Sequence, residues 1–210
     1  GGTPGWVAGV YSGSVNDGNW HQVVFTFQSG VASGSKLFLD GILVTSAFTY
    51  TIADQVGLLS IGASHDGTTI QQYFNGSIYE VRIWNAVISD ANIALYNNKP
   101  IDPATQTNLV GYWSFAEGSG TTAANSVATQ PSLTLVNAPV WTQLGKAGVV
   151  DLFEGGYGLA FNGSTQYGIL AATGSYAYPS GTIECRFRTT STSGALVSKG
   201  SAYALFVGTN

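Results

Sequence analysis

Polar and apolar residues alternate with a period of two along this chain. The segments 20–27, 182–188 and 203–207 show the pattern clearly, and in the second of them apolar Ile183 and Phe187 alternate with charged residues. Successive side chains of a β-strand point to opposite faces of a sheet, so this period predicts strands with one buried face. Many short strands of this kind predict an all-β protein built as an antiparallel β-sandwich.

Two local signals refine this expectation. Residues 36–44 predict a hairpin, because the dipeptide Asp40-Gly41 accepts the positive φ angles of a type I′ turn. Residues 89–97 predict one short helix, in which Ser89 caps the first turn.

The low content of charged residues excludes several classes of protein. Only 9% of the 210 residues are charged, with seven basic and eleven acidic side chains and a net charge of −4. A nucleic-acid partner is therefore not expected, because binding phosphates needs a basic stripe. Membrane insertion is not expected either, because polar residues interrupt every apolar run well before ~18 residues. The 12% of aromatic residues excludes a disordered chain.

Five blocks in the first part of the chain point to a known family. They are residues 17–23 (DGNWHQV), 37–41 (LFLDG), 59–62 (LSIG), 74–85 (FNGSIYEVRIWN) and 89–96 (SDANIALY). In order and spacing they resemble the middle and the C-terminal end of a laminin-G-like or pentraxin-like module. The resemblance implies the concanavalin A-type jelly roll, a β-sandwich.

Four blocks in the second part resemble the beginning of the same module. They are residues 109–121 (LVGYWSFAEGSGT), 158–164 (GLAFNGS), 182–188 (TIECRFR) and 196–200 (LVSKG). The family's order is therefore reversed in this chain.

This order defines three regions. Residues 1–99 form the C-terminal half of a module, residues 100–107 a linker, and residues 108–210 the N-terminal half. The lack of any Met indicates a window of a longer protein or a processed product. We prefer one period of a tandem array, in which each second half completes the first half of the next copy. The alternative is a circular permutant that completes itself, and both interpretations bring Asn210 next to Gly1.

The candidate catalytic residues do not favour an enzyme. The family includes glucanases, and retaining hydrolysis needs two carboxylates about 5 Å apart. Asp151 with Glu154 is the closest acidic pair in the sequence and reads as a solvated turn, while Glu184 stands alone on its strand. Cys185 is expected to be a buried, inert thiol, and His21 a structural histidine.

The resemblance also implies calcium, which many modules of the family bind. Where the family often places acids, this chain has Gln166 and Tyr79, and Asn162 and Asn75 stand where Asp is common. Calcium prefers several oxygen ligands with two or more carboxylates, so we expect no cofactor. The remaining candidate calcium ligands are Asp17, Asp54 and Asp66.

Carbohydrate binding is the other theme of the family. It needs exposed aromatic rings that stack on sugars, with amides and carboxylates beside them. Six aromatic residues are expected in or near loops: Trp6, Tyr11, Tyr50, Tyr73, Tyr176 and Tyr178. The favoured glycan site is Tyr73 with His65, Asp66, Gln71 and Gln72, and the alternative is that these are ordinary loop residues.

The sequence thus predicts a non-catalytic structural or adhesive repeat module of an extracellular, cell-surface or virion-surface protein. Its expected partners are copies of itself or adjacent repeats, with which it would form a fibre by complementation of half-modules. The alternative function is that of a lectin-like adhesion module that binds glycans.

Overall fold

The computed structural model describes residues 13–52, 57–65, 68–97, 99–144, 156–171, 176–200 and 202–208. It confirms the predicted all-β sandwich, since every strand pairing between described residues is antiparallel. The strands before the linker are β1 (Trp20–Gln28), β2 (Ser35–Leu39), β3 (Ile42–Phe48), β4 (Leu59–Ile61), β5 (Ser64–His65), β6 (Ile70–Gln71) and β7 (Asn75–Trp84). Those after it are β8 (Leu109–Trp113), β9 (Thr122–Ala123), β10 (Leu133–Val136), β11 (Val140–Gln143), β12 (Tyr157–Asn162), β13 (Tyr167–Leu170), β14 (Ser180–Arg188), β15 (Gly194–Lys199) and β16 (Tyr203–Val207).

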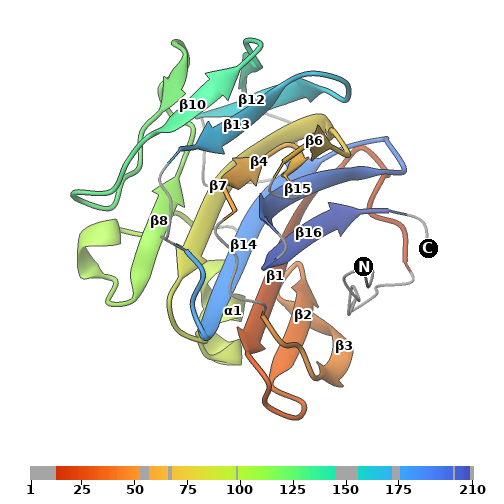
Figure 1. Cartoon of the computed structure of the whole chain (residues 1–210), viewed down its shortest axis with the longest axis vertical. Coiled ribbons are helices and arrows are strands. Elements are labelled where there is room, and N and C mark those ends of the chain that lie inside the picture. The colour runs from red at the N-terminus through yellow and green to blue at the C-terminus, as the bar shows by residue number, and fades with distance from the viewer. Residues whose placement is uncertain are drawn as a thin grey trace.

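Two main sheets form the sandwich. The larger has the order β11-β12-β7-β14-β1-β2-β3, and β8 also pairs with β7 (Figure 1). The smaller has the order β16-β15-β4-β13-β10-β9, while β5 and β6 form a separate hairpin. The core fills the space between the two sheets, where Phe25 and Ile83 of one sheet share a buried cluster with Ile61, Leu133 and Val197 of the other. Among the described residues, the chain offers no helix of the length and apolarity needed to span a bilayer.

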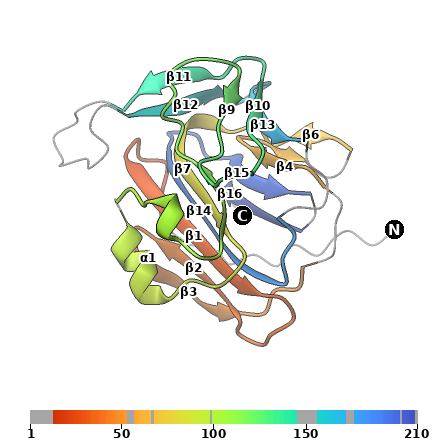
Figure 2. The same ribbon diagram turned by 90° about the vertical axis from the view of Figure 1, so that its left-hand side faces the viewer.

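The predicted helix is confirmed as α1 (Asp90–Tyr96). The hydroxyl of Ser89 accepts a hydrogen bond from the backbone N–H of Asn92, which caps the first turn. The side chain of Ile93 is buried in a second apolar cluster on the outer face of the larger sheet, together with Val24 and Phe38. Figure 2 shows α1 on the outside of this sheet, beside β1, β2 and β3. In the linker, residues 103–105 form the short helix η1 (Pro103–Thr105).

The predicted hairpin is also confirmed. Asp40 and Gly41 connect β2 to β3 with φ angles of 50° and 80°, as a type I′ turn requires. The side-chain amide of Asn97, at the end of α1, donates a hydrogen bond to the backbone carbonyl of Asp40 at 2.8 Å. The helix and the hairpin turn are therefore fixed to each other.

Strand β7 departs from the period of two that other segments of the chain show. Glu80 has a φ of 55°, and the register with β14 shifts opposite it, so the strand carries a β-bulge at this residue. Ile78 before the bulge and Val81 and Ile83 after it therefore all belong to the main core cluster. An inserted residue reverses the faces of the residues that follow, so a fixed period of two fails here.

Strands from the two halves of the sequence are interleaved in both sheets. In the larger sheet β14 lies between β7 and β1, and in the smaller sheet β4 lies between β15 and β13. Figure 1 shows the blue strand β14 between the yellow and red strands of the first half. The array and the permutant both remain predictions, and the two ends named above, Gly1 and Asn210, lie outside the described residues.

Candidate functional site

The candidate glycan site falls on the hairpin of β5 and β6 and the segment that follows it. His65 pairs with Ile70 across the hairpin and is only 8% exposed, whereas Gln71 and Gln72 are exposed. The backbone carbonyl of Gln72 accepts a hydrogen bond from the N–H of Ala195 in β15, which fixes the segment to the smaller sheet. Asp66 lies outside the described residues.

Tyr73 faces a second tyrosine that the sequence did not single out. Its ring centroid lies 6.2 Å from that of Tyr167 in β13, and both residues are half-buried. Gln166, the neighbour of Tyr167, donates through its side-chain amide to the carbonyls of Asn137 and Ala138. The structure thus places an aromatic pair beside exposed amides, the kind of surface on which a sugar ring stacks.

The other loop aromatics are less accessible than expected. Tyr176 is 1% exposed, and its ring lies 5.9 Å from that of Trp113 in the core, so the interpretation of Tyr176 as a ligand-binding residue is wrong. The hydroxyl of Tyr50 donates to the carbonyl of Ala202, and burial raises the pKa of Tyr50 to about 12. Tyr178 is half-buried, while Trp6 and Tyr11 lie outside the described residues.

Asp17, the one described candidate for calcium, already has hydrogen-bond donors. Its carboxylate accepts from the backbone and the side chain of Asn19 and from Nε2 of His21, at 2.8, 2.9 and 3.1 Å. These bonds, the backbone bond of Asn19 first, lower the pKa of Asp17 to about 2. Asp54 and Asp66 lie outside the described residues, and within the described ranges no three His, Cys, Asp or Glu side chains are grouped for a metal ion.

Asn162 uses its amide to shape a turn. Its Oδ1 accepts hydrogen bonds from the backbone N–H groups of Ser164, Thr165 and Gln166, at 3.0, 3.0 and 3.3 Å. Its Nδ2 donates to the hydroxyl of Thr165. A side chain that closes its own loop in this way has a structural role at the position where the family often has an acid.

His21 lies between two carboxylates. Its Nδ1 is 2.8 Å from Asp40 and its Nε2 is 3.1 Å from Asp17. A carboxylate only accepts hydrogen bonds, so both ring nitrogens must carry protons for both bonds to form. Burial opposes the charge, but the bonds to Asp40 and Asp17 outweigh it and raise the pKa of His21. His21 therefore has the structural role predicted for it, as a link between the start of β1 and the hairpin turn.

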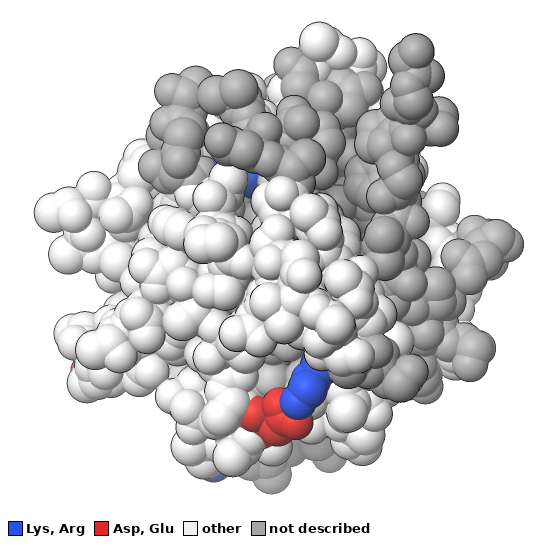
Figure 3. Space-filling model, turned by 60° about the horizontal axis from the view of Figure 1, so that its bottom comes forward, with Lys and Arg blue, Asp and Glu red and all other residues white. Residues whose placement is uncertain are grey.

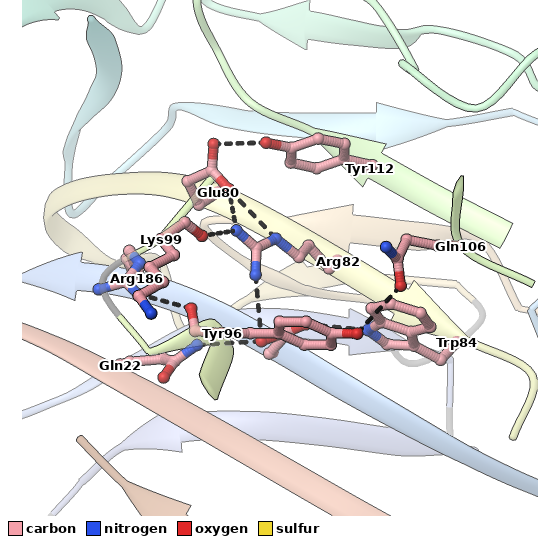
Figure 4. A network of polar contacts seen from close by, with 10 residues as sticks. Gln22, Glu80, Arg82, Trp84, Tyr96, Lys99, Gln106, Tyr112 and Arg186 are labelled. Carbon is pink, nitrogen blue, oxygen red and sulfur yellow. Dashed lines mark hydrogen bonds and ion pairs between the residues drawn. The ribbon is translucent and has the colours of Figure 1, made fainter. Parts of the chain in front are cut away.

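A buried polar network on the outer face of the larger sheet was not predicted. Its centre is Arg82, whose Nε and Nη2 donate to Glu80 at 3.1 and 2.5 Å, and whose Nη1 lies 3.6 Å from Glu184 (Figure 4). The hydroxyl of Tyr112 donates to Glu80 at 2.7 Å, and the indole of Trp84 donates to Glu184 at 2.9 Å. Glu80, Arg82 and Glu184 are 5%, 0% and 0% exposed, so these charges are held entirely by one another and by their neighbours.

The network also holds the segment that leads into the linker. Arg82 donates through Nη2 to the backbone carbonyl of Lys99 at 2.8 Å, and Arg186 donates to that of Tyr96 at 3.3 Å. The ring of Tyr96 stacks on Trp84 with centroids 6.0 Å apart, and its hydroxyl donates to Gln106.

Burial changes the acid–base properties of these groups in different directions. It raises the pKa of Glu80. It opposes the charge of Arg82, yet the attraction of Glu184 and Glu80 is larger, and the pKa of the guanidinium rises. Burial lowers the pKa of Arg186 and raises that of Cys185, whose thiol is fully buried as expected. Both glutamates thus accept hydrogen bonds from fixed donors, Glu80 from Arg82 and Tyr112, and Glu184 from Gln22 and Trp84.

One signal in the sequence marks this network. The motif Glu-x-Arg occurs twice on long strands, as Glu80 with Arg82 and as Glu184 with Arg186. In a chain with so few charges, two Glu-x-Arg pairs indicate that the two strands carry oppositely charged partners for each other. The register that brings Arg82 opposite Glu184 follows from the fold and could not be read from either strand.

A pocket lies beside the network, where β12 and β8 both leave the same edge of β7. It is lined by Tyr79, Glu80, Ser114, Leu144 and Tyr157. The outer surface is poor in charge elsewhere as well, and the face in Figure 3 shows acidic and basic groups meeting at one small place. Elsewhere on that face the described residues are mostly uncharged, with only small areas of blue and red besides this one.

Comparison with known proteins supports the resemblance seen in the sequence. Residues 1–94 match the Laminin_G_3 family, described as the concanavalin A-like lectin/glucanases superfamily. The chain is also 26% identical over 112 residues to the "Sushi, von Willebrand factor type A, EGF and pentraxin domain-containing protein 1" of Mus musculus. That match covers 50% of this chain and 3% of the mouse protein. No solved structure matches the chain.

These findings confirm the laminin-G-like resemblance over the first part of the chain, in agreement with the β-sandwich. They favour an extracellular module of the adhesion or lectin-like kind.

Proposed function

We propose that this protein is a non-catalytic structural or adhesive module of an extracellular or virion-surface protein. The interleaving of the two halves of the sequence in both sheets carries this proposal. A module divided in this way can be completed by the same chain or by the next copy in an array, because the strand pairings are the same in both. A fibre built of such copies would present the low-charge surface described above to its surroundings.

The positions of the acidic residues support a role without catalysis. Glu80 and Glu184 neutralise Arg82 inside the protein, and Asp17 and Asp40 hold His21. A glycosidase needs a nucleophile and an acid that both face the substrate, whereas these four carboxylates hold a buried arginine and a structural histidine. Incubation with β-glucans should release no reducing sugar, and release that depended on Glu80 would overturn the proposal.

The mass of the natural protein tests the array directly. A mass several times that of one 21.8 kDa unit would support a tandem array of modules. A mass near one unit would support the circular permutant or a self-complementing subunit, and the tandem array would then be wrong while the adhesive role remained.

Carbohydrate binding is the second candidate function, and the pair of Tyr73 and Tyr167 favours it. A glycan array should show binding by the parent protein that Tyr73→Ala abolishes. Tyr157→Ala is a matched control, because Tyr157 is another half-buried tyrosine. It is the first residue of β12, at the opposite end of that strand from Asn162. Failure of the parent protein to bind any glycan would leave only the structural role.

A further inference from the structure

The longest strand of each half pairs only with the other half in the described structure. Strand β7, in the first half, pairs with β12, β14 and β8, all in the second half. Strand β14, in the second half, pairs with β1 and β7, both in the first. Strand β4 likewise pairs with β13 and β15. Neither half can therefore satisfy the backbone of its central strands by itself.

The charges across this boundary are complementary. Glu80 and Arg82 come from the first half, and Glu184 and Arg186 come from the second. Glu184 also accepts a hydrogen bond from Gln22 of the first half at 2.9 Å. A foreign strand in the place of β14 would leave Arg82 buried with a missing partner, which is strongly destabilising. The surface that β7 presents is thus matched to the second half of this same sequence.

One covalent connection joins the two halves. The linker, residues 100–107, is largely exposed and contains Pro100 and Pro103. Within it Ile101 packs against the second apolar cluster and Gln106 accepts the bond from Tyr96, whereas the bonds from Arg82 and Arg186 to the backbone lie just before it, at Lys99 and Tyr96. A different path of the linker would change the contacts of Ile101 and Gln106 but would leave the bonds of the two arginines and the strand pairings intact.

We propose that two copies of this chain exchange halves across the edges of β7 and β4. In the exchanged form, β8, β12 and β14 of one copy pair with β7 of the other, and β13 and β15 of one copy pair with β4 of the other. The proposal rests on the structural role proposed above and identifies the partner as a second copy of this chain.

Concentration decides between the closed and the exchanged forms. Every interaction between halves is common to both, so their free energies differ mainly in the linker and in the entropy of association. Within one chain the linker keeps the halves at an effective concentration on the order of millimolar. A dilute single chain is therefore closed, and exchange increases with protein concentration or when copies are joined in an array.

Disulfide trapping can detect the exchange in the full chain. Gln28 in β1 and Ser180 in β14 are paired neighbours from different halves, and the spacing of paired strand residues suits a disulfide. Gln28→Cys and Ser180→Cys would be made in separate chains, mixed, unfolded, refolded together and oxidised. We expect a covalent dimer of twice the 21.8 kDa mass whose share rises with concentration.

Two controls make the outcome decisive. The double variant Gln28→Cys/Ser180→Cys should form its disulfide within one chain, which verifies the geometry. The dimer should retain the near-ultraviolet circular dichroism of the parent monomer. Half exchange would be wrong if the double variant formed its disulfide but the mixed chains gave no covalent dimer. It would also be wrong if Gln28→Cys alone gave as much covalent dimer as the mixture.

The unmodified chain supplies an independent measurement. After refolding at high concentration, light scattering should detect a dimer with the native near-ultraviolet spectrum, and a monomer at every concentration would overturn the proposal. Such a failure would leave the adhesive role in place, since that role is tested by the natural protein's mass and by glycan binding.

Discussion

Two clusters of charged side chains join segments of this protein, and they differ mainly in burial. The network of Glu80, Arg82 and Glu184 is at most 5% exposed and joins β7, β14 and the segment before the linker. The cluster of Asp17, His21 and Asp40 joins β1 to the hairpin turn, and its two carboxylates are 42% and 43% exposed. Both clusters place one cation between two anions.

The difference shows how the surroundings determine what such a cluster does. Removing charges from water costs several kcal/mol per ion, so the buried network is favourable only while every member has its partners. Water screens the exposed cluster, and the loss of one partner there costs little. The buried network therefore restricts which strand can pair with β7, whereas the exposed cluster responds to pH.

Replacing Arg82 tests the buried network most severely. Arg82→Met keeps much of the side-chain volume but leaves Glu80 and Glu184 buried without their cation. We expect a loss of about 3–5 kcal/mol in the free energy of unfolding, measured by urea denaturation. A protein that failed to fold would agree with this expectation.

Arg188→Met is the matched control, because Arg188 lies on β14 with its guanidinium 4.9 Å from the ring of half-exposed Trp20. It should cost about 0.5–1 kcal/mol. Equal losses for the two variants would show that burial of the network is not what distinguishes Arg82.

A smaller change removes one hydrogen bond from the same network. Tyr112→Phe deletes the hydroxyl that donates to Glu80 and leaves the ring in place. Bonds to charged groups contribute about 1.5–3 kcal/mol, and we expect a loss in that range by urea denaturation. Tyr96→Phe deletes the bond to Gln106 near the surface, and its loss should stay below about 1 kcal/mol. The reverse order would contradict the assigned roles.

The fold was largely predictable, because local patterns determine it. The turn at Asp40-Gly41, the cap at Ser89 and the alternation in 182–188 each specify a local structure that the protein adopts. The resemblance to a laminin-G-like module then indicated how such elements are arranged. The pattern failed at Glu80, since nothing in the local sequence distinguishes a bulge from a regular strand position.

The candidate site was harder to predict, because it depends on contacts between distant residues. The pairing of Tyr73 with Tyr167 and the burial of Tyr176 arise only after the two sheets pack. Within the sequence Glu184 stands alone on its strand, but its partners Gln22 and Trp84 lie on other strands, 162 and 100 residues away along the chain. The glycan site itself stays a prediction.

The exposed cluster should make stability depend on pH. The folded state raises the pKa of His21 above its ordinary value of 6.5, so folding favours the imidazolium. Its contribution is complete below about pH 6.5 and is lost as the pH rises through the folded pKa. His21→Gln should therefore cost about 1 kcal/mol at pH 5.5 and much less at pH 9, as compared by urea denaturation at each pH.

Asp17→Asn separates the two bonds of that histidine. The pKa of Asp17 is lowered from 3.8 to about 2, so its contribution is present above about pH 4 and lost as the pH falls through 2. Nuclear magnetic resonance should show a lower pKa for His21 in this variant than in the parent. An unchanged pKa would mean that Asp40 alone holds the imidazolium.

The smallest effect is expected at the surface ion pair of Lys36 in β2 and Asp90 at the start of α1. The two side chains are 36% and 56% exposed, and Nζ of Lys36 is 2.9 Å from the carboxylate. Lys36→Met should cost about 0.2–1 kcal/mol, and the cost should shrink further in 1 M salt, because ions screen an exposed pair. This contact length lies within the range of 2.5 to 3.6 Å found in the buried network, so geometry alone would predict similar losses. A loss at Lys36 as large as that at Arg82 would therefore show that contact distance, rather than burial, sets the energies of these ion pairs.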